Sequence, residues 1–201
     1  RDVLAKYVAV ASAAGLPLSL VEVETFSLAR ALAAQAPEPS LLVDIGARST
    51  NFSIIEEGFV SLTHNVEIAG HDLTRATARG LNIQISRAEE RKQTQGLTGG
   101  AGENQIAQLM VSYLDLLASE AERVLAIHER GGAKVARVIL AGGSVRLPGL
   151  ADYFKTKLNR PVEIADPFQK LLGPAELKHQ FDELGPSFAV AVGLAEKVLA
   201  S

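Results

Sequence analysis

Hydrophobic and polar residues alternate along the chain in patterns that predict short helices and strands in turn. Apolar residues recur at helical spacing over 3–14, and Gly15 follows as a natural C-terminal stop. The apolar stretch 18–23 predicts a strand, and 25–35 predicts a second helix. Residues 36–40 include two prolines, which continue neither a helix nor a strand ladder, so a linker is expected there.

The residues after this linker predict an antiparallel meander of three strands. Strands rich in apolar residues are expected over 41–45, 51–56 and 59–66. Short turns separate them, one containing Gly46 and the other Gly58, and turns of this length join antiparallel neighbours. The first strand is an almost continuous apolar run, which is typical of a buried strand.

Helical and extended patterns alternate over the rest of the chain. Ser86 and Glu89 have the spacing of a capping box, which predicts a helix start, and the charged run 89–92 is expected to be a solvated face of that helix. The glycine-rich stretch 95–102 predicts a loop. A meander continued in this way is typical of a mixed sheet with helices on its faces. The further helices are expected over 70–80, 104–130, 148–158, 174–184 and 186–199, and the further strands over 136–141 and 162–165.

Composition and charge narrow the function classes. The 201 residues suffice for one domain, or for one domain and part of another. With 20 basic and 23 acidic residues, the chain lacks the basic excess of a nucleic-acid-binding protein. Cysteine is absent, which excludes disulfides and thiolate metal sites and fits a reducing compartment. The four histidines are dispersed, and no apolar run reaches the roughly 18 residues of a membrane span.

The turn after the first meander strand carries the first candidate chemistry. Asp44 lies at the end of a buried strand, and Gly46 follows where the chain must turn sharply. Ser49, Thr50 and Asn51 then add two hydroxyls and an amide. Such a turn can direct amide N–H groups at an anion, while a carboxylate at the strand end can hold Mg²⁺ directly or through water. An ordinary hairpin, in which Asp44 and Ser49 satisfy turn amides, is the alternative.

Two further segments carry weaker signals. The strand 138–141 runs into Gly142 and Gly143, and glycines at a strand end let a flat ring or a phosphate approach the backbone. A plain connection to the next helix is the alternative, and neither the Walker motif nor the dinucleotide fingerprint is present. Gly70 marks a turn into a helix with Asp72 in its first turn, which is expected to be a helix cap, with a role beside a nucleotide as the alternative.

Taken in order, these segments resemble the actin-like ATPases, and within them the PilM family of type IV pilus assembly proteins, relatives of the cell-division protein FtsA. Residues 41–55 are similar to the second phosphate motif of that superfamily, and 138–144 to its adenosine motif, although Ala141 stands where a third glycine is common. The resemblance covers nearly the whole chain. Its other supporting stretches are 13–16, 21–23, 69–76, 147–150, 161–168 and 185–195.

The resemblance implies an α/β fold of two ribonuclease-H-like halves with ATP between them. Residues 37–201 would form the second actin-like domain, a half-domain with a mixed five-stranded sheet and a smaller inserted subdomain at about 81–103. Residues 1–36 would be the end of the first domain. The chain begins with Arg1, and the first phosphate motif of the family has no match, so we expect a fragment of a longer protein with at most weak ATPase activity.

The resemblance also assigns cofactors and site residues. ATP and Mg²⁺ are the expected cofactors, with Asp44 as the metal ligand and no catalytic residue assigned. Ten residues are expected to bind the nucleotide, five from the phosphate loop, three from the adenosine loop and two from the helix that flanks the base in relatives: Asp44, Gly46, Ser49, Thr50 and Asn51; Gly142, Gly143 and Ser144; and Glu120 and Arg123.

The expected partner is the cytoplasmic tail of the inner-membrane protein PilN, held mainly by the first domain, together with other pilus assembly proteins and with self-association left open. The resemblance thus implies a cytoplasmic protein that is peripheral at the inner membrane through its partners, without nucleic acid and without direct membrane insertion.

Two other functions on the same fold remain open. A phosphotransferase of the sugar-kinase type would need a catalytic carboxylate and substrate residues from the first half. An FtsA-like division protein would carry a C-terminal amphipathic membrane helix, and the chain ends at 197–201 without one, which favours the pilus scaffold.

Overall fold

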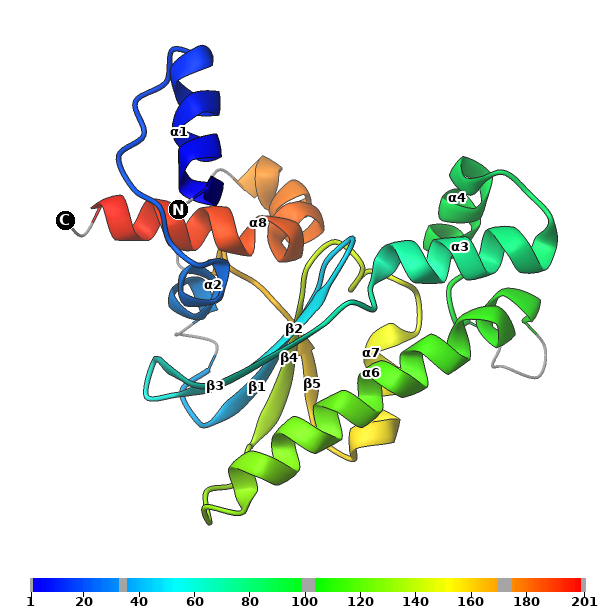
Figure 1. The fold of residues 1–201 in the computed structure, drawn as a ribbon. Coiled ribbons are helices and arrows are strands. Elements are labelled where there is room, and N and C mark those ends of the chain that lie inside the picture. Colours follow the sequence, from blue (N-terminus) through cyan, green and yellow to red (C-terminus); the bar gives the residue numbers. More distant parts are fainter. Residues whose placement is uncertain (1, 33–35, 99–103, 170–174, 200–201) are drawn as a thin grey trace.

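A five-stranded mixed sheet forms the centre of the computed structural model, which describes residues 2–32, 36–98, 104–169 and 175–199. The strands lie in the order β3-β2-β1-β4-β5 (Figure 1). The meander is antiparallel, whereas β4 pairs with β1, and β5 with β4, in parallel. The bounds are β1 (Ser40–Ile45), β2 (Thr50–Glu56), β3 (Phe59–Val66), β4 (Arg137–Ala141) and β5 (Val162–Ile164).

Burial along the strands follows from their places in the sheet. β1 and β4 are central and buried on both faces, which explains their continuous apolar runs. β3 lies at one edge, where its side chains alternate between exposed and half-buried. A register shift between Ile54 and Ile55 interrupts its pairing with β2. The predicted mixed five-stranded sheet is confirmed.

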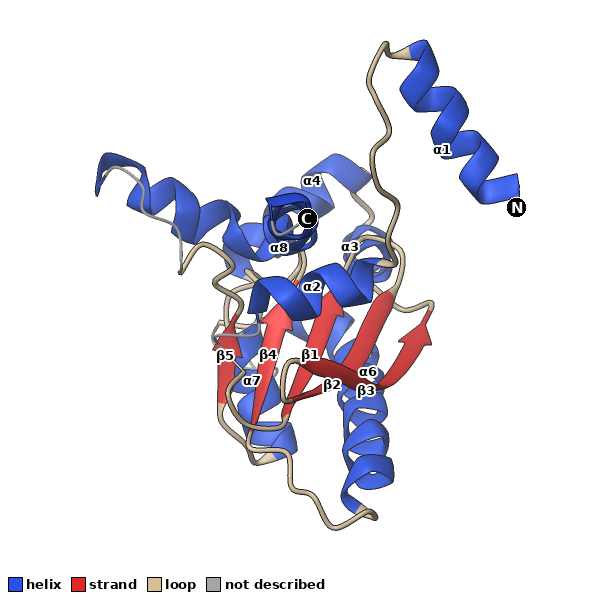
Figure 2. Ribbon diagram, turned by 90° about the vertical axis from the view of Figure 1, so that its left-hand side faces the viewer, coloured by secondary structure: helices blue, strands red, loops and turns tan. Residues whose placement is uncertain are grey.

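Helices cover both faces of this sheet (Figure 2). On one face, α6 (Gln105–Glu129) and α7 (Leu150–Leu158) bury Leu114 and Phe154 against Leu41. On the other, α2 (Glu24–Leu32) and α8 (Lys178–Leu199) bury Leu28 and Ala189 against Leu42. Consecutive residues of β1 thus contribute to two separate apolar clusters, as the alternation of side chains along a strand requires.

A helix pair stands beside the sheet and forms one wall of the site. α3 (Gly70–Leu81) follows β3, and α4 (Ile85–Gln95) folds back next to it (Figure 1). Asn82 ends α3 in the left-handed conformation, which a short polar side chain tolerates. The loop predicted at 95–102 continues α4, with 96–98 in a turn and 99–102 outside the described residues.

The first part of the chain differs from the sequence-based expectation. α1 (Asp2–Ala13) forms as predicted, but none of its residues is buried. Residues 16–23 are not a strand, because the sheet ends at β3 and β5 and this stretch pairs with neither. No helix in the described ranges is both long and apolar enough to cross a membrane.

Two helices begin at other residues than the sequence predicted. α4 begins at Ile85 after Gln84, without a side-chain cap, because the Glu89 carboxylate bonds to Thr74 of α3 and to Lys92 of α4 instead of closing a capping box. α7 begins at Leu150, after Gly149 in the left-handed conformation, instead of at 148.

The C-terminal helices predicted on either side of Gly185 are one helix. A 3₁₀ turn, η1 (Ala175–Leu177), precedes α8, and Pro186 lies inside α8. The backbone around this proline is held from outside, because the Gly142 amide donates to the Pro186 carbonyl at 2.9 Å.

The cap of the longest helix allows a stability test. The Asn104 side chain accepts from the Ile106 and Ala107 amides at 2.9 and 3.3 Å, and it donates to the Gly96 and Thr98 carbonyls. We expect Asn104→Ala to lower the free energy of unfolding by about 1–2 kcal/mol, measured by urea denaturation. The exposed Gln108→Ala on the same helix is the control, and an equal effect of both changes would contradict the capping role.

Candidate functional site

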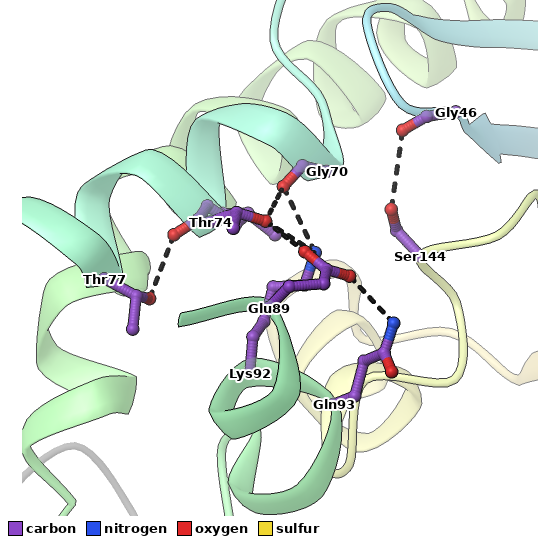
Figure 3. Close-up of polar contacts among 9 residues, drawn as sticks. Gly46, Gly70, Thr74, Thr77, Glu89, Lys92, Gln93 and Ser144 are labelled. Carbon is purple, nitrogen blue, oxygen red and sulfur yellow. Dashed lines mark hydrogen bonds and ion pairs between the residues drawn. The ribbon is translucent and has the colours of Figure 1, made fainter. Parts of the chain in front are cut away.

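Three connections of the sheet meet at one backbone carbonyl. The Gly46 oxygen, in the β1–β2 turn, accepts from the Gly70 amide at 3.0 Å. The Ser144 hydroxyl, in the β4–α7 loop, donates to the same oxygen at 3.4 Å (Figure 3). Gly70 has no room for a Cβ, because that atom would overlap the Ser144 hydroxyl. The β1–β2 turn, the start of α3 and the β4–α7 loop are therefore held together as one structure.

A cavity of about 660 Å³ opens beside this junction. One wall is formed by the junction of Gly46, Gly70 and Ser144, and the opposite wall by residues of α4. Its lining residues are Gly46, Ala47, Gly70, His71, Thr74, Arg75, Ile85, Ser86, Glu89, Lys92, Gly143 and Ser144.

A buried lysine ties α4 to α3 at this cavity. Lys92 Nζ lies 2.8 Å from the Glu89 carboxylate, 2.9 Å from the Thr74 hydroxyl and 3.2 Å from the Gly70 carbonyl (Figure 3). Burial raises the pKa of Glu89, but the hydrogen bonds from Lys92 and Thr74 outweigh burial and keep the pKa below its usual range. A buried ammonium needs this compensation, because an unpaired charge is costly in the interior.

Sequence reasoning missed this pair, because it treated 89–92 as a solvated face. One feature of the sequence could have indicated that Lys92 is buried. It lies four residues after the apolar Ala88 and so on the same helical face, and the structure shows Ala88 fully buried. Glu89, at three residues from Lys92, reaches the ammonium and keeps part of its carboxylate exposed at the cavity wall.

Asp44 lies against the first glycine of the β4–α7 loop. Gly142 has φ +92°, and a Cβ there would meet both the Asp44 carboxylate and the Ile45 carbonyl, so only glycine fits. Burial raises the pKa of Asp44 to about 6, and the negative charge of Glu24 adds to the rise. The carboxyl is therefore held in a site that favours its neutral form unless a cation is present.

The structure brings together part of the predicted site. Gly46, Gly143 and Ser144 line the cavity. Ser49 lies in an adjoining polar depression of about 620 Å³, which shares His71 and Arg75 with the cavity. The residues predicted from two loops that are about 100 positions apart in the chain thus meet at one place, since parallel pairing puts the carboxyl ends of β1 and β4 side by side.

Two predicted phosphate-loop residues point elsewhere. Thr50 is fully buried, and its hydroxyl donates to the Ile68 carbonyl at 2.6 Å, so it cannot also meet a ligand in the cavity. Asn51 donates to the Glu24 carboxylate at 2.9 Å and accepts from Asn65 at 2.7 Å, which holds its side chain across the strands. Asp72 acts as the expected cap, accepting from the Ala69 amide.

The two predicted helix residues do not line the cavity. Glu120 and Arg123 pair with each other and with His64 of β3, with Glu120 at 2.8 Å from the His64 ring nitrogen. Their contacts with His64 place these side chains next to the edge strand β3, whereas only the start of α6 approaches the α3–α4 pair (Figure 1). Their assignment to the nucleotide base stays a prediction that this cavity does not support.

The donors at the site suit a magnesium nucleotide better than a protein-only metal site. Among the described residues, no group of three or more His, Asp or Glu side chains could hold a metal ion. Mg²⁺ requires less, because it is bound through one or two carboxylates and completed by waters and phosphate oxygens. Asp44 can supply such a carboxylate, but neither it nor Gly142 is among the residues that line the cavity, and Gly142 is instead packed against Asp44 and Ile45.

Comparison with solved structures defines the class. MreB5 of Spiroplasma citri, solved bound to AMPPNP, matches with a TM-score of 0.70 at 16% identity, over 97% of this chain and 64% of that one. The PilM–PilN type IV pilus biogenesis complex matches with a TM-score of 0.85 at 28% identity, over 96% of this chain and 57% of that one. The fold is that of the actin-like ATPases.

The chain belongs to the family described as type IV pilus assembly protein PilM, whose model matches residues 1–198. The cell-division protein FtsA of Agrobacterium fabrum is also similar, with 29% identity over 177 residues, which cover 76% of this chain and 38% of FtsA. The chain therefore spans less than two thirds of the length of each of these relatives.

The raised pKa of Asp44 predicts a pH-dependent stability. Its folded pKa of about 6 exceeds the ordinary 3.8, so the folded chain binds this proton more tightly, and the resulting stabilisation is lost as pH rises through about 6. In metal-free buffer we expect Asp44→Asn, which stays neutral, to exceed the wild type in free energy of unfolding by about 2–3 kcal/mol at about pH 8 and by little at about pH 4.

Urea denaturation at both pH values measures this difference. Asp152→Asn, which changes an exposed carboxyl on α7, is the matched control and should leave the pH profile unchanged. A constant difference between Asp44→Asn and the wild type at the two pH values would contradict the assignment.

Proposed function

We propose that this chain is the ATP-binding second domain of a type IV pilus assembly scaffold. The observation that carries the proposal is the cavity at the Gly46 junction, where the two glycine loops face the Glu89–Lys92 pair of α4. In the domain division that we propose, 1–36 end the first actin-like domain and 37–201 form the second, with α4 in its smaller subdomain.

The cavity offers different chemistry to the two ends of a nucleotide. Ser49 of the β1–β2 turn and the guanidinium of Arg75 on α3 would face the phosphates, since hydroxyls and cations stabilise anionic oxygens. At the opposite wall, the partly exposed Glu89 carboxylate can accept hydrogen bonds from ribose hydroxyls. Gly143 lines the cavity without a side chain, which would let the base lie against its backbone.

Asp44 would hold Mg²⁺, directly or through water. When bound, Mg²⁺ neutralises the negative charge of the phosphates. The ionised Asp44 carboxylate, which burial alone disfavours, would be stabilised by the adjacent cation.

A scaffold role is favoured over rapid hydrolysis. Two carboxylates belong to the proposed site: Asp44 is assigned to the metal, and Glu89, which lines the cavity, is bonded to Lys92 and Thr74. An engaged carboxylate with a lowered pKa is a poor general base for an attacking water, since catalysis favours a pKa near the working pH. We therefore expect ATP binding with at most weak hydrolysis.

The proposed partner is the cytoplasmic tail of PilN. The support is the similarity to the PilM–PilN complex, in which the related chain is solved with that partner. Through PilN the whole protein would lie at the cytoplasmic side of the inner membrane. A pull-down with the PilN tail, performed on this chain and on the longer protein, tests whether the first domain carries most of the contact, as we expect.

A side chain at Gly143 should block nucleotide binding without disturbing the fold. An added Cβ would be in ordinary van der Waals contact with the Ser187 hydroxyl at 3.7 Å, so the fold tolerates it, and Gly143→Val adds bulk to a loop residue that lines the cavity. We expect at least about tenfold weaker binding of MgATP by isothermal titration calorimetry, equivalent to about 1.4 kcal/mol. Thr94→Ala, on the outer face of α4, is the control. Equal affinity of Gly143→Val and the wild type would place the ligand elsewhere.

The role of Asp44 is tested by the metal dependence of binding. The wild type should bind ATP more tightly with Mg²⁺ than with a chelator, because the carboxylate and the phosphates share the cation. Asp44→Asn keeps the size of the side chain and loses its charge, so we expect most of this Mg²⁺ enhancement to disappear. An unchanged ratio of the two affinities in the variant would exclude Asp44 as the ligand.

A further inference from the structure

The second half of the edge strand β3 has the same order of residue types in both directions. From Leu62 to Val66 it pairs regularly with β2, after the register shift. These two apolar residues are half-buried, Thr63 and Asn65 are exposed, and His64 lies at the centre. Among the described residues no strand pairs with the outer edge of β3 (Figure 2), so backbone N–H and C=O groups there are open to a further strand.

A stripe of four residues on α6 has the same symmetry. Its members are spaced by four, three and four positions, which places them on one face of the helix: Leu116, Glu120, Arg123 and Ile127. Leu116 is 51% exposed and Ile127 44% exposed. In both directions the stripe therefore runs from an exposed apolar residue, through two opposite charges, to a second exposed apolar residue.

His64 joins the centres of the two patterns. Its ring lies 2.8 Å from the Glu120 carboxylate and 3.2 Å from a terminal nitrogen of Arg123. The midpoint of the strand half and the midpoint of the stripe therefore meet at one border of the molecule. A surface of this kind can contact a copy of itself across a two-fold axis, because such an axis makes every contact twice.

We propose that the β3–α6 border, which consists of 62–66 and the α6 stripe, is a docking surface for a second copy of this chain. The two-fold axis passes beside His64, and the strands pair antiparallel over five residues. Leu62 then lies opposite the partner's Val66 on the face that carries α6, and apolar cross-strand pairs of this kind stabilise a sheet. No nucleotide takes part in this contact.

The charges of the stripe fit a second copy in one register. The two α6 helices run antiparallel across the axis, so that Leu116 faces the partner's Ile127 and Glu120 faces the partner's Arg123. A shift of the axis to either charged residue would oppose two carboxylates or two guanidinium groups, which is unfavourable. The exposed apolar residues and the opposite charges are thus complementary in the same arrangement.

The register shift limits the contact to a closed pair. Ser61 has no partner residue on β2, because Leu62 pairs with Ile54 and Val60 with Ile55. The bulge there increases the local twist, so the second strand can follow the edge only beyond this point. A border of five strand residues and four helix residues forms a small interface, which is typical of a weak and reversible dimer.

Reversal of one charge on the stripe should separate the copies. Glu120→Arg leaves two cations on the stripe and Arg123→Glu leaves two anions, so each variant opposes like charges across its own axis. By sedimentation equilibrium without nucleotide, over about 10–500 µM protein, we expect a wild-type dimer and at least about tenfold weaker association of either variant. Glu122→Arg, on another exposed part of α6, is the matched control and should associate like the wild type.

A mixture of the two variants distinguishes a contact between copies from a change within one copy. One variant supplies two cations and the other two anions, so both charge pairs across the axis are restored in the mixed dimer. We expect the equimolar mixture to associate within about threefold of the wild type. A mixture that stays as monomeric as its components, or a monomeric wild type, would overturn the docking surface.

Further measurements keep the test decisive. If circular dichroism shows that either charge variant is unfolded, the exposed Ile127→Glu replaces both, and association equal to that of the wild type would contradict the proposal. Hydrogen exchange tests the strand pairing, since amides of 62–66 should exchange at least about twofold more slowly in the wild-type dimer than in Arg123→Glu. Equal exchange would overturn this pairing. A longer protein that stays monomeric where this chain dimerises would show the border covered, which also overturns the proposal.

Discussion

The site depends on a single peptide carbonyl that serves two loops at once. The Gly46 oxygen accepts hydrogen bonds from the Gly70 amide at the start of α3 and from the Ser144 hydroxyl. Ser144 reaches it because β4 pairs with β1 in parallel, which puts the loops that follow these two strands side by side. A side chain at Gly70 or Gly142 would push these segments apart. Glycine is therefore needed at both positions so that the segments can touch, and not only so that the chain can turn. The cavity walls follow from this junction, since α3 is anchored here and α4 is anchored to α3.

Much of the fold could be predicted because its elements are set by local pattern. The apolar runs of β1 and β4 and the helical spacing of α6 leave little choice of structure. The predictions fail at segments whose secondary structure depends on contacts with distant parts of the chain. The stretch 18–23 is as apolar as a strand but pairs with neither edge of the sheet, and Pro186 stands inside α8, where the sequence predicted a break between two helices.

The candidate site was predictable to a similar degree. The glycines of both loops carry a signal, because positive φ and close approach require glycine. Thr50 and Asn51 have the right residue types, but cross-strand partners engage their side chains. Lys92 could not be assigned from its charged neighbours, because its burial depends on how α4 packs on α3. Contacts between distant segments decide which polar side chains are available to a ligand.

The register shift between Ile54 and Ile55 has a consequence for solubility. β3 is an edge strand without Lys, Arg, Asp or Glu, and such an edge could template pairing with another chain. A bulge adds an unpaired residue and increases local twist, so a straight strand from a neighbour cannot follow the edge over its full length. The register shift therefore limits pairing along the β3 border by shape rather than by charge.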